Sequence, residues 1–101
     1  MASYHRFEQR RRRLRQDWPG RVLLHRFGDF YELYGDDAER VAEALGLAAV
    51  RNARLPRCLQ PKLGIPYWRL YRDLCRLESA GILALVLESQ QPPRPHPDSD
   101  D

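Results

Sequence analysis

The chain has little that would favour secretion, membrane insertion or a disulfide framework. Its 101 residues include two cysteines, Cys58 and Cys75, without Cys-x-x-Cys spacing, so we expect free thiols in a reducing compartment. The N-terminal arginines are not followed by an apolar segment, and nowhere do about 18 apolar residues run together, as a membrane helix requires. We therefore expect a cytoplasmic chain with no membrane partner.

Patterns for nucleotide binding and for metal or nuclease chemistry are also missing. None of the six glycines is followed by lysine, which excludes the Gly-x-x-x-x-Gly-Lys-[Ser/Thr] phosphate loop. The histidines and cysteines lack metal-ligand spacing. Asp29, Glu32, Asp36 and Asp37 are close in sequence, but no acid-x-lysine pattern accompanies them. We expect a chain that is not an enzyme and holds no cofactor or metal.

Positive charge is concentrated near the N-terminus. The formal net charge is +3, yet four consecutive arginines occupy positions 10–13, and three of the last four residues are acidic. This asymmetry indicates a polyanionic partner that meets the N-terminal end. Candidate phosphate contacts there are Arg11, Arg12, Arg13 and Arg15. A solvated basic helix is the alternative interpretation.

Hydrophobic periodicity predicts a small α/β (α+β) domain, with a mixed β-sheet flanked by about three helices. The predicted order is a basic helix ending at Pro19-Gly20, strands at 22–27 and 30–34, a helix from Asp36, a strand at 47–50, a loop at 55–62, a helix from Tyr67 and a strand at 82–87. Asp36 is predicted to be the N-cap of its helix, with Glu39 three residues on. The apolar run 82–87 is typical of a central strand.

Three segments follow from these patterns. Residues 1–20 form a basic N-terminal helix that is part of the domain, and residues 21–90 form its core. Residues 91–101 are rich in proline and acidic residues. Such a composition does not support a packed core, so we expect a disordered tail.

The most informative stretch lies between Gly28 and Gly35 and reads Asp-Phe-Tyr-Glu-Leu-Tyr. In an extended strand Phe30, Glu32 and Tyr34 share one face, while the two residues between them face the opposite side. One face then presents a carboxylate beside aromatic rings. An aromatic side chain near a hydrogen-bond acceptor suits a protein that enters a base stack.

This stretch resembles the mismatch-recognition motif of MutS-type DNA mismatch repair proteins, a Phe-x-Glu set in Gly-Asp-Phe-Tyr-Glu-Leu. The resemblance continues through residues 36–40, Gly64-Ile65-Pro66-Tyr67 and the closing block at 88–90, and so covers about residues 6–90. One departure is Trp68, where the family usually has histidine. Several blocks in the family's order are a stronger signal than Phe-x-Glu alone.

The resemblance implies the fold of the MutS N-terminal domain, either as a free-standing module or as part of a split or truncated repair protein. It implies that Phe30 inserts into duplex DNA at a mismatched or unpaired base and that Glu32 hydrogen-bonds that base. Further candidate phosphate contacts, each also compatible with a solvated surface charge, are Arg51, Arg54, Arg57 and Lys62. Other mismatch repair proteins are possible partners, and ATP is expected only for full-length family members.

An alternative function keeps the fold without mismatch recognition. In that case the chain is a protein-interaction or regulatory module of DNA repair, and its basic residues bind a partner or DNA without preference for mismatches.

Overall fold

The computed structural model describes residues 2–88, which form three α-helices and one four-stranded sheet. The elements are α1 (Ala2–Asp17), β1 (Val22–Phe27), β2 (Phe30–Tyr34), α2 (Gly35–Leu45), β3 (Lys62–Pro66), α3 (Leu70–Ser79) and β4 (Ala84–Leu87), with short 3-10 turns η1 (Arg57–Leu59) and η2 (Tyr67–Arg69). This arrangement confirms the predicted α+β class. The predicted tail at 91–101 lies outside the described residues.

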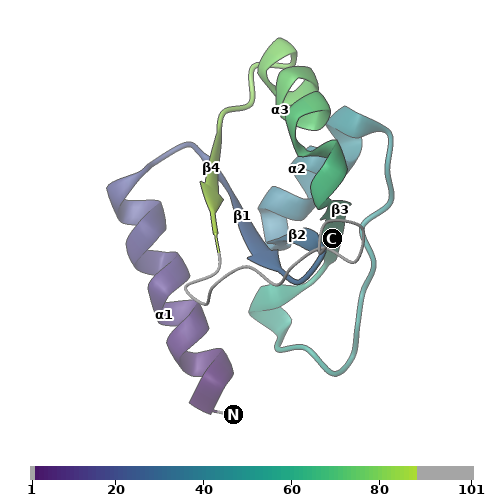
Figure 1. The fold of residues 1–101 in the computed structure, drawn as a ribbon. Helices are drawn as coiled ribbons and strands as arrows, with labels where there is room; N and C mark the ends of the chain where they lie inside the picture. Colours follow the sequence, from purple (N-terminus) through teal and green to yellow (C-terminus); the bar gives the residue numbers. More distant parts are fainter. Residues whose placement is uncertain (1, 89–101) are drawn as a thin grey trace, which may run out of the picture.

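The sheet is mixed, with strand order β3-β2-β1-β4 (Figure 1). β1 and β2 are antiparallel neighbours joined by a tight turn, and β2 pairs antiparallel with β3. β4 returns parallel to β1. Gly28 begins the β1–β2 turn with a φ of +59°, a conformation that residues with a side chain rarely adopt. Because β2 is paired along both edges, its side chains have fixed positions.

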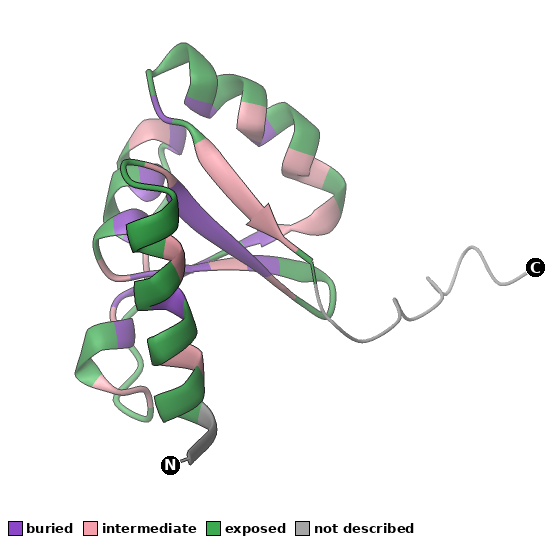
Figure 2. Ribbon diagram, turned by 90° about the vertical axis from the view of Figure 1, so that its left-hand side faces the viewer, coloured by how far each residue is buried: buried purple, intermediate pink, exposed green. Residues whose placement is uncertain are grey.

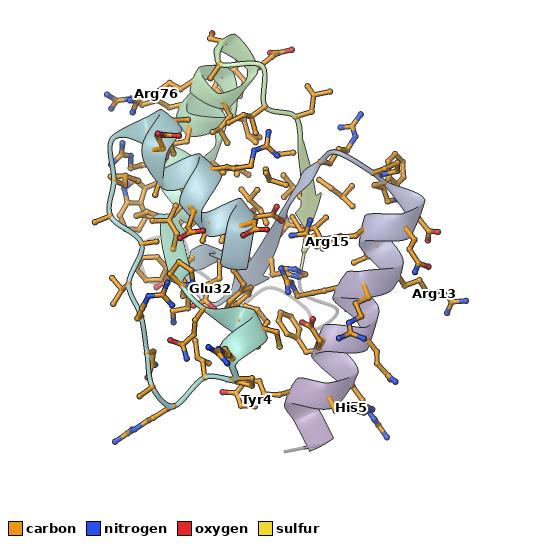
Figure 3. All side chains as sticks on the ribbon, turned by 180° about the vertical axis from the view of Figure 1, so that it is seen from behind. Tyr4, His5, Arg13, Arg15, Glu32 and Arg76 are labelled. Carbon is orange, nitrogen blue, oxygen red and sulfur yellow. The ribbon has the colours of Figure 1, made fainter. Side chains whose placement is uncertain are left out.

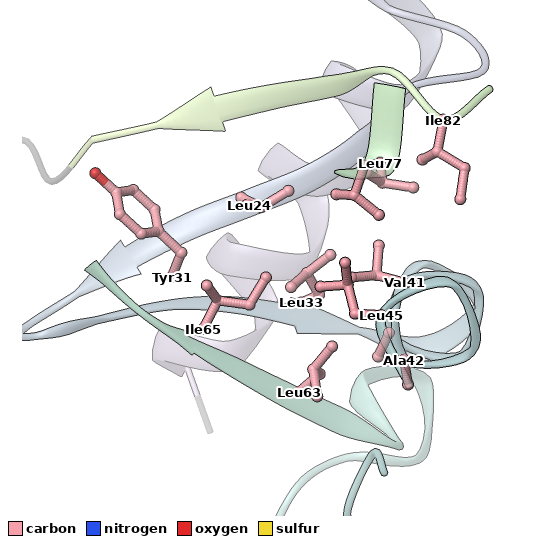
Figure 4. Packing of buried hydrophobic residues seen from close by; sticks show 12 residues of the cluster. Leu24, Tyr31, Leu33, Val41, Ala42, Leu45, Leu63, Ile65, Leu77 and Ile82 are labelled. Carbon is pink, nitrogen blue, oxygen red and sulfur yellow. The ribbon is translucent and has the colours of Figure 1, made fainter. Parts of the chain in front are cut away.

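The main core lies between the sheet and the helices α2 and α3. Strand residues of alternating positions supply one side of this core, and the apolar stripes of the two helices supply the other. Figure 4 shows this cluster, which includes Leu24, Tyr31, Leu33, Val41, Ala42, Leu45, Leu63, Ile65, Leu77 and Ile82. The prediction that Tyr31 and Leu33 face the core is confirmed.

Helix α1 packs on the opposite face of the sheet, so the domain has three layers. Its Phe7 ring lies 4.9 Å from the ring of His25 and 5.4 Å from that of Tyr34. The helix is otherwise mostly exposed, as its largely green surface in Figure 2 shows. A few contacts therefore hold α1 over this face.

The carboxylate of Asp37 joins three elements. It is buried in the first turn of α2, accepts a hydrogen bond from the backbone N–H of Leu23 in β1 at 3.0 Å, and pairs with Arg15 of α1 at 3.0 Å. The predicted capping role of Asp36 is wrong. Helix α2 begins at Gly35 with Tyr34 as its N-cap, and no side chain makes a cap hydrogen bond.

The third strand is not where the sequence predicted it. Residues 47–50 form no strand, and only Val50 makes an isolated bridge, to Lys62. The strand is β3, in a segment that was predicted to be part loop and part approach to a helix. Leu63 and Ile65 of β3 alternate into the core, but Gly64 and Pro66 weaken the local strand signal. An edge position tolerates that proline because no further strand needs its missing N–H.

The last strand is also placed differently from the prediction. β4 lies at the other edge of the sheet, next to β1 alone, and its residues are half-buried. Parallel pairing with β1 explains its apolar composition, since one edge and parts of both faces contact the protein. In α3, Leu77 is fully buried, whereas Tyr71 is 82% exposed. The apolar face of that helix is therefore narrow.

We expect Asp37→Ala to destabilise the domain by about 2–4 kcal/mol, because it leaves the buried N–H of Leu23 without its acceptor and removes the partner of Arg15. Asp36→Ala is the matched control, since Asp36 is exposed in the same helical turn, and should change stability by less than about 0.5 kcal/mol. Urea unfolding followed by circular dichroism measures both. Equal losses for the two variants would contradict the role given to Asp37.

Candidate functional site

Phe30 stands at the start of β2 on the face opposite the main core. It pairs with Phe27 of β1 on one side and with Pro66 of β3 on the other. Its side chain is 44% exposed, and its ring packs over Gly64, where an added Cβ would lie 3.5 Å from Phe30 Cδ1. A large apolar ring thus projects from a strand that is hydrogen-bonded on both edges.

Glu32 lies two residues further along the same face and is held by two partners. Its Oε1 accepts a hydrogen bond from the Tyr34 hydroxyl at 2.5 Å, and its Oε2 lies 3.5 Å from the ammonium of Lys62. Burial and the hydrogen bond to Glu32 raise the pKa of Tyr34, so this hydroxyl stays a donor at neutral pH. The predicted grouping of these β2 residues on one face is confirmed. The role of Tyr34 in orienting Glu32 was not predicted.

A second group of polar side chains braces the β1–β2 turn from the core face of the sheet. Tyr31 donates to Glu88 Oε2 at 2.7 Å and accepts from Arg26 Nη1 at 3.2 Å. Arg26 Nε also donates to the Gly28 carbonyl at 2.6 Å. The turn that precedes Phe30 is therefore anchored by charged hydrogen bonds, which fix the direction in which Phe30 leaves the sheet.

His25 lies beneath α1, between the rings of Phe7 and Tyr34. Burial, followed by the positive charges of Arg11 and Arg10, lowers its pKa to about 4. The imidazole is therefore neutral at neutral pH and serves as packing.

The structure divides the candidate arginines of α1 into two kinds. Arg11 is buried, donates to Glu8 at 3.1 Å and to the Tyr34 carbonyl at 3.5 Å, and lies over the Tyr34 ring. Its guanidinium is used inside the protein, so the predicted phosphate contact is corrected for this residue. Arg15 points toward the body of the protein in Figure 3 and pairs with Asp37, although 42% of its side chain remains exposed.

The other candidate basic residues remain available at the surface. Arg12 and Arg13 are exposed on α1, and Arg13 points away from the body of the protein in Figure 3. The loop that follows α2 exposes Arg51, Arg54 and Arg57. Lys62 is half-buried, and its pairing with Glu32 brings one candidate phosphate contact directly beside the Phe-x-Glu motif.

Two kinds of feature are absent from the part of the chain that the structure describes. Over residues 2–88 the acidic, histidine and cysteine side chains form no group of three suited to a metal ion. No helix in the same range has the length and apolar character needed to cross a bilayer. Cys58 and Cys75 are both free, as predicted, and both are exposed.

The fold and the Phe-x-Glu face are those that the resemblance to the MutS N-terminal domain implies, and comparison with known families agrees on the family. The model of the family MutS domain I matches residues 5–94. The chain therefore belongs to the MutS domain I family.

Three relatives show how much of a longer protein this chain represents. It is 33% identical over 82 residues to the DNA mismatch repair protein MutS of Nitratidesulfovibrio vulgaris strain DP4, covering 81% of this chain and 9% of that protein. It is 37% identical to MutS of Bradyrhizobium sp. strain ORS 278, over 74% of this chain and 8% of that protein. It is 33% identical to MutS of Chloroflexus aurantiacus strain J-10-fl, over 83% of this chain and 10% of that protein. The chain spans about a tenth of the length of these relatives.

The lowered pKa of His25 predicts acid sensitivity. Because the folded value of about 4 lies below the ordinary 6.5, stability is complete above pH 6.5 and is lost as the pH falls toward 4. The free energy of unfolding should drop by about 2 kcal/mol between pH 7.5 and pH 5 from this group. Urea unfolding at both pH values should show a smaller drop for His25→Gln, whereas His5→Gln, at an exposed histidine, keeps the full drop. An unchanged drop in His25→Gln would refute the assignment.

Proposed function

We propose that this chain binds duplex DNA at mismatched or unpaired bases and acts in DNA mismatch repair together with other proteins of that process. The observation on which the proposal rests is the pairing of an exposed, rigidly held Phe30 with an oriented Glu32 on one face of β2. Membership of the MutS domain I family and relatives named as DNA mismatch repair proteins support it. The proposal involves no catalytic step and no cofactor bound by this chain.

Phe30 is suited to act as a wedge because its backbone and side chain lose little conformational entropy when the ring inserts. The residue sits in a central strand between β1 and β3, and its ring already rests on Gly64. Unstacking one base step requires a few kcal/mol, and a mismatched step has already lost part of its stacking and pairing. The wedge therefore selects duplexes that deform easily rather than a particular base sequence.

Glu32 supplies the polar part of the recognition. Tyr34 orients the carboxylate, and remaining lone pairs can accept a hydrogen bond from an N–H of the displaced base. A free carboxylate would be repelled by the phosphate backbone, and the ammonium of Lys62 reduces that repulsion locally. Lys62 thus serves the proposed site through Glu32 as well as through any phosphate it contacts.

The exposed arginines supply the general attraction to DNA. Stacking of one base contributes about 1–3 kcal/mol, and a single small module covers roughly 600–1,000 Å² of surface. Contacts between arginines and phosphates make up the rest, and their contribution falls as salt rises. We therefore expect weak and salt-sensitive binding by the isolated chain.

A protein-interaction module is the second candidate function. Two exposed aromatic side chains favour it, Trp68 in η2 at 66% exposure and Tyr71 in α3 at 82%. Neither belongs to the Phe-x-Glu face, and exposed aromatic residues are enriched in protein interfaces. This function predicts that removing Phe30 has no effect on DNA binding.

Phe30→Ala should abolish the preference for a duplex with one unpaired thymine over its fully paired counterpart while leaving the salt dependence unchanged. Fluorescence anisotropy with both duplexes, at low and near-physiological salt, gives the two affinities. Trp18→Ala is the matched control, because Trp18 is an aromatic residue of similar exposure, 46%, that lies just after the C-terminal end of α1. A native protein that binds both duplexes alike, or a variant that keeps the preference, would refute the wedge.

The double variant Arg12→Gln/Arg13→Gln should weaken binding to paired and mismatched duplexes alike. If both arginines contact phosphates, the slope of log affinity against log salt becomes shallower by about 2. The matched control is Arg40→Gln/Arg72→Gln, which removes the same charge from exposed positions of α2 and α3 on the other side of the sheet. Equal changes in slope for the two double variants would mean that total charge, not the surface of α1, determines binding.

A further inference from the structure

A hollow of about 330 Å³ opens beside the Phe-x-Glu face and has no part in the wedge itself. Helix α1 contributes Tyr4 and Phe7 to its walls, and β1 contributes Phe27. Leu55 and Leu59, from the segment before β3, close the opposite side. In Figure 3 Tyr4 of α1 lies below Glu32 of β2 on this side of the molecule. We call this feature the aromatic hollow.

Polar groups of the aromatic hollow are few and have defined partners. Glu32 and Lys62 form one part of its lining and are 3.5 Å apart, and the Tyr34 ring, whose hydroxyl holds Glu32, forms another. The walls therefore offer aromatic faces together with the Glu32 carboxylate as an acceptor, the Lys62 ammonium as a donor and the hydroxyl of Tyr4. The volume lies at the small end of ligand pockets, which measure about 300–1,000 Å³.

We propose that the aromatic hollow receives an unstacked nucleobase from DNA bound at Phe30. This inference rests on the proposed function and adds to it a binding site for the displaced base. A base is flat and aromatic, so it can stack on rings such as those of Phe27 and Phe7, and its edge carries N–H and carbonyl groups for Glu32 and Lys62.

Other ligands fit the same walls less well. An apolar side chain from a partner protein would separate Glu32 and Lys62 from water without hydrogen-bonding either of them, which is unfavourable. A free phosphate group would meet one ammonium beside a carboxylate that repels it. A base satisfies both the aromatic walls and the pair of polar groups.

The position of the hollow also fits a displaced base. Phe27, one of its walls, is the direct cross-strand partner of Phe30, and side chains of such pairs are about 5 Å apart at Cβ. Successive bases are about 3.4 Å apart along the DNA axis. The nearest wall of the hollow is therefore within about two base steps of the Phe30 ring. A base that has lost its partner needs the least free energy to leave the stack, and stacking in the hollow would replace what it loses.

Three duplexes that differ at one central position separate this inference from the wedge. One is fully paired, one has an unpaired thymidine, and one has an unpaired abasic residue, which keeps the backbone but has no base. Anisotropy titrations give two ratios of affinity. The ratio of abasic to paired measures how far insertion of Phe30 favours a duplex that deforms easily, and the ratio of thymidine to abasic measures recognition of the base itself. Variants of the walls show how much of this second ratio comes from the aromatic hollow.

We expect the native protein to bind the thymidine duplex at least fivefold more tightly than the abasic one, the lower end of what stacking of one base contributes. Phe27→Ala removes one wall and Leu55→Trp narrows the hollow from the other side, and each should lower this ratio at least twofold. Trp18→Ala should leave it unchanged, since Trp18 has nearly the same exposure as Phe27, 46% against 47%, but does not line the hollow.

The outcomes are distinguishable. Equal affinity for the thymidine and abasic duplexes, with both preferred over paired DNA, would contradict base binding in the aromatic hollow. It would still be consistent with insertion of Phe30. A ratio of thymidine to abasic that survives both Phe27→Ala and Leu55→Trp also overturns the hollow. No preference for either lesion over paired DNA refutes the proposed function, and the inference falls with it.

Discussion

The buried carboxylate of Asp37 holds the two helical layers to one strand. This carboxylate accepts a hydrogen bond from the Leu23 N–H, in the part of β1 that precedes the residues paired with β2. The same carboxylate forms an ion pair with Arg15 and so also contacts α1. A buried charge is tolerated here because both carboxylate contacts are short and directional. Without this link α1 would be held on the sheet by a few aromatic contacts and by Arg11, which reaches the Tyr34 carbonyl and ring, and the walls that α1 adds beside Glu32 would be less firmly placed.

The strand β2 serves two purposes because alternate residues face opposite layers. Tyr31 and Leu33 complete the main core, while Phe30 and Glu32 form the proposed site on the other face. Residues that stabilise the fold therefore also fix the direction of the site. Under the proposed function, Phe30 would respond to how easily DNA deforms, whereas the aromatic hollow would respond to whether a base is present. Together the two would let a domain of this size distinguish damaged from intact duplex without reading sequence.

Much of the fold follows from local patterns. The alternation in residues 30–34 and the branched and aromatic residues of β1 identified the two central strands, and helical periodicity identified the three helices. The strand β3 was missed because Gly64 and Pro66 interrupt the alternation of Leu63 and Ile65. Residues 47–50 have the composition of a strand but are largely exposed, since no neighbouring strand covers them. Composition alone does not reveal whether a partner strand exists.

In the candidate site too, local sequence patterns predicted some features and long-range packing decided others. Adjacent residues and the period of a strand were enough to place Phe30 and Glu32 on one face, because that geometry is local. The separate roles of Arg11 and Arg12, the edge position of β4 and the aromatic hollow depended on which side of α1 meets the sheet and on strand order. Those features arise from contacts between residues far apart in the chain. Local sequence therefore specified which residues form the motif, and long-range packing decided which charges stay exposed and what surrounds the motif.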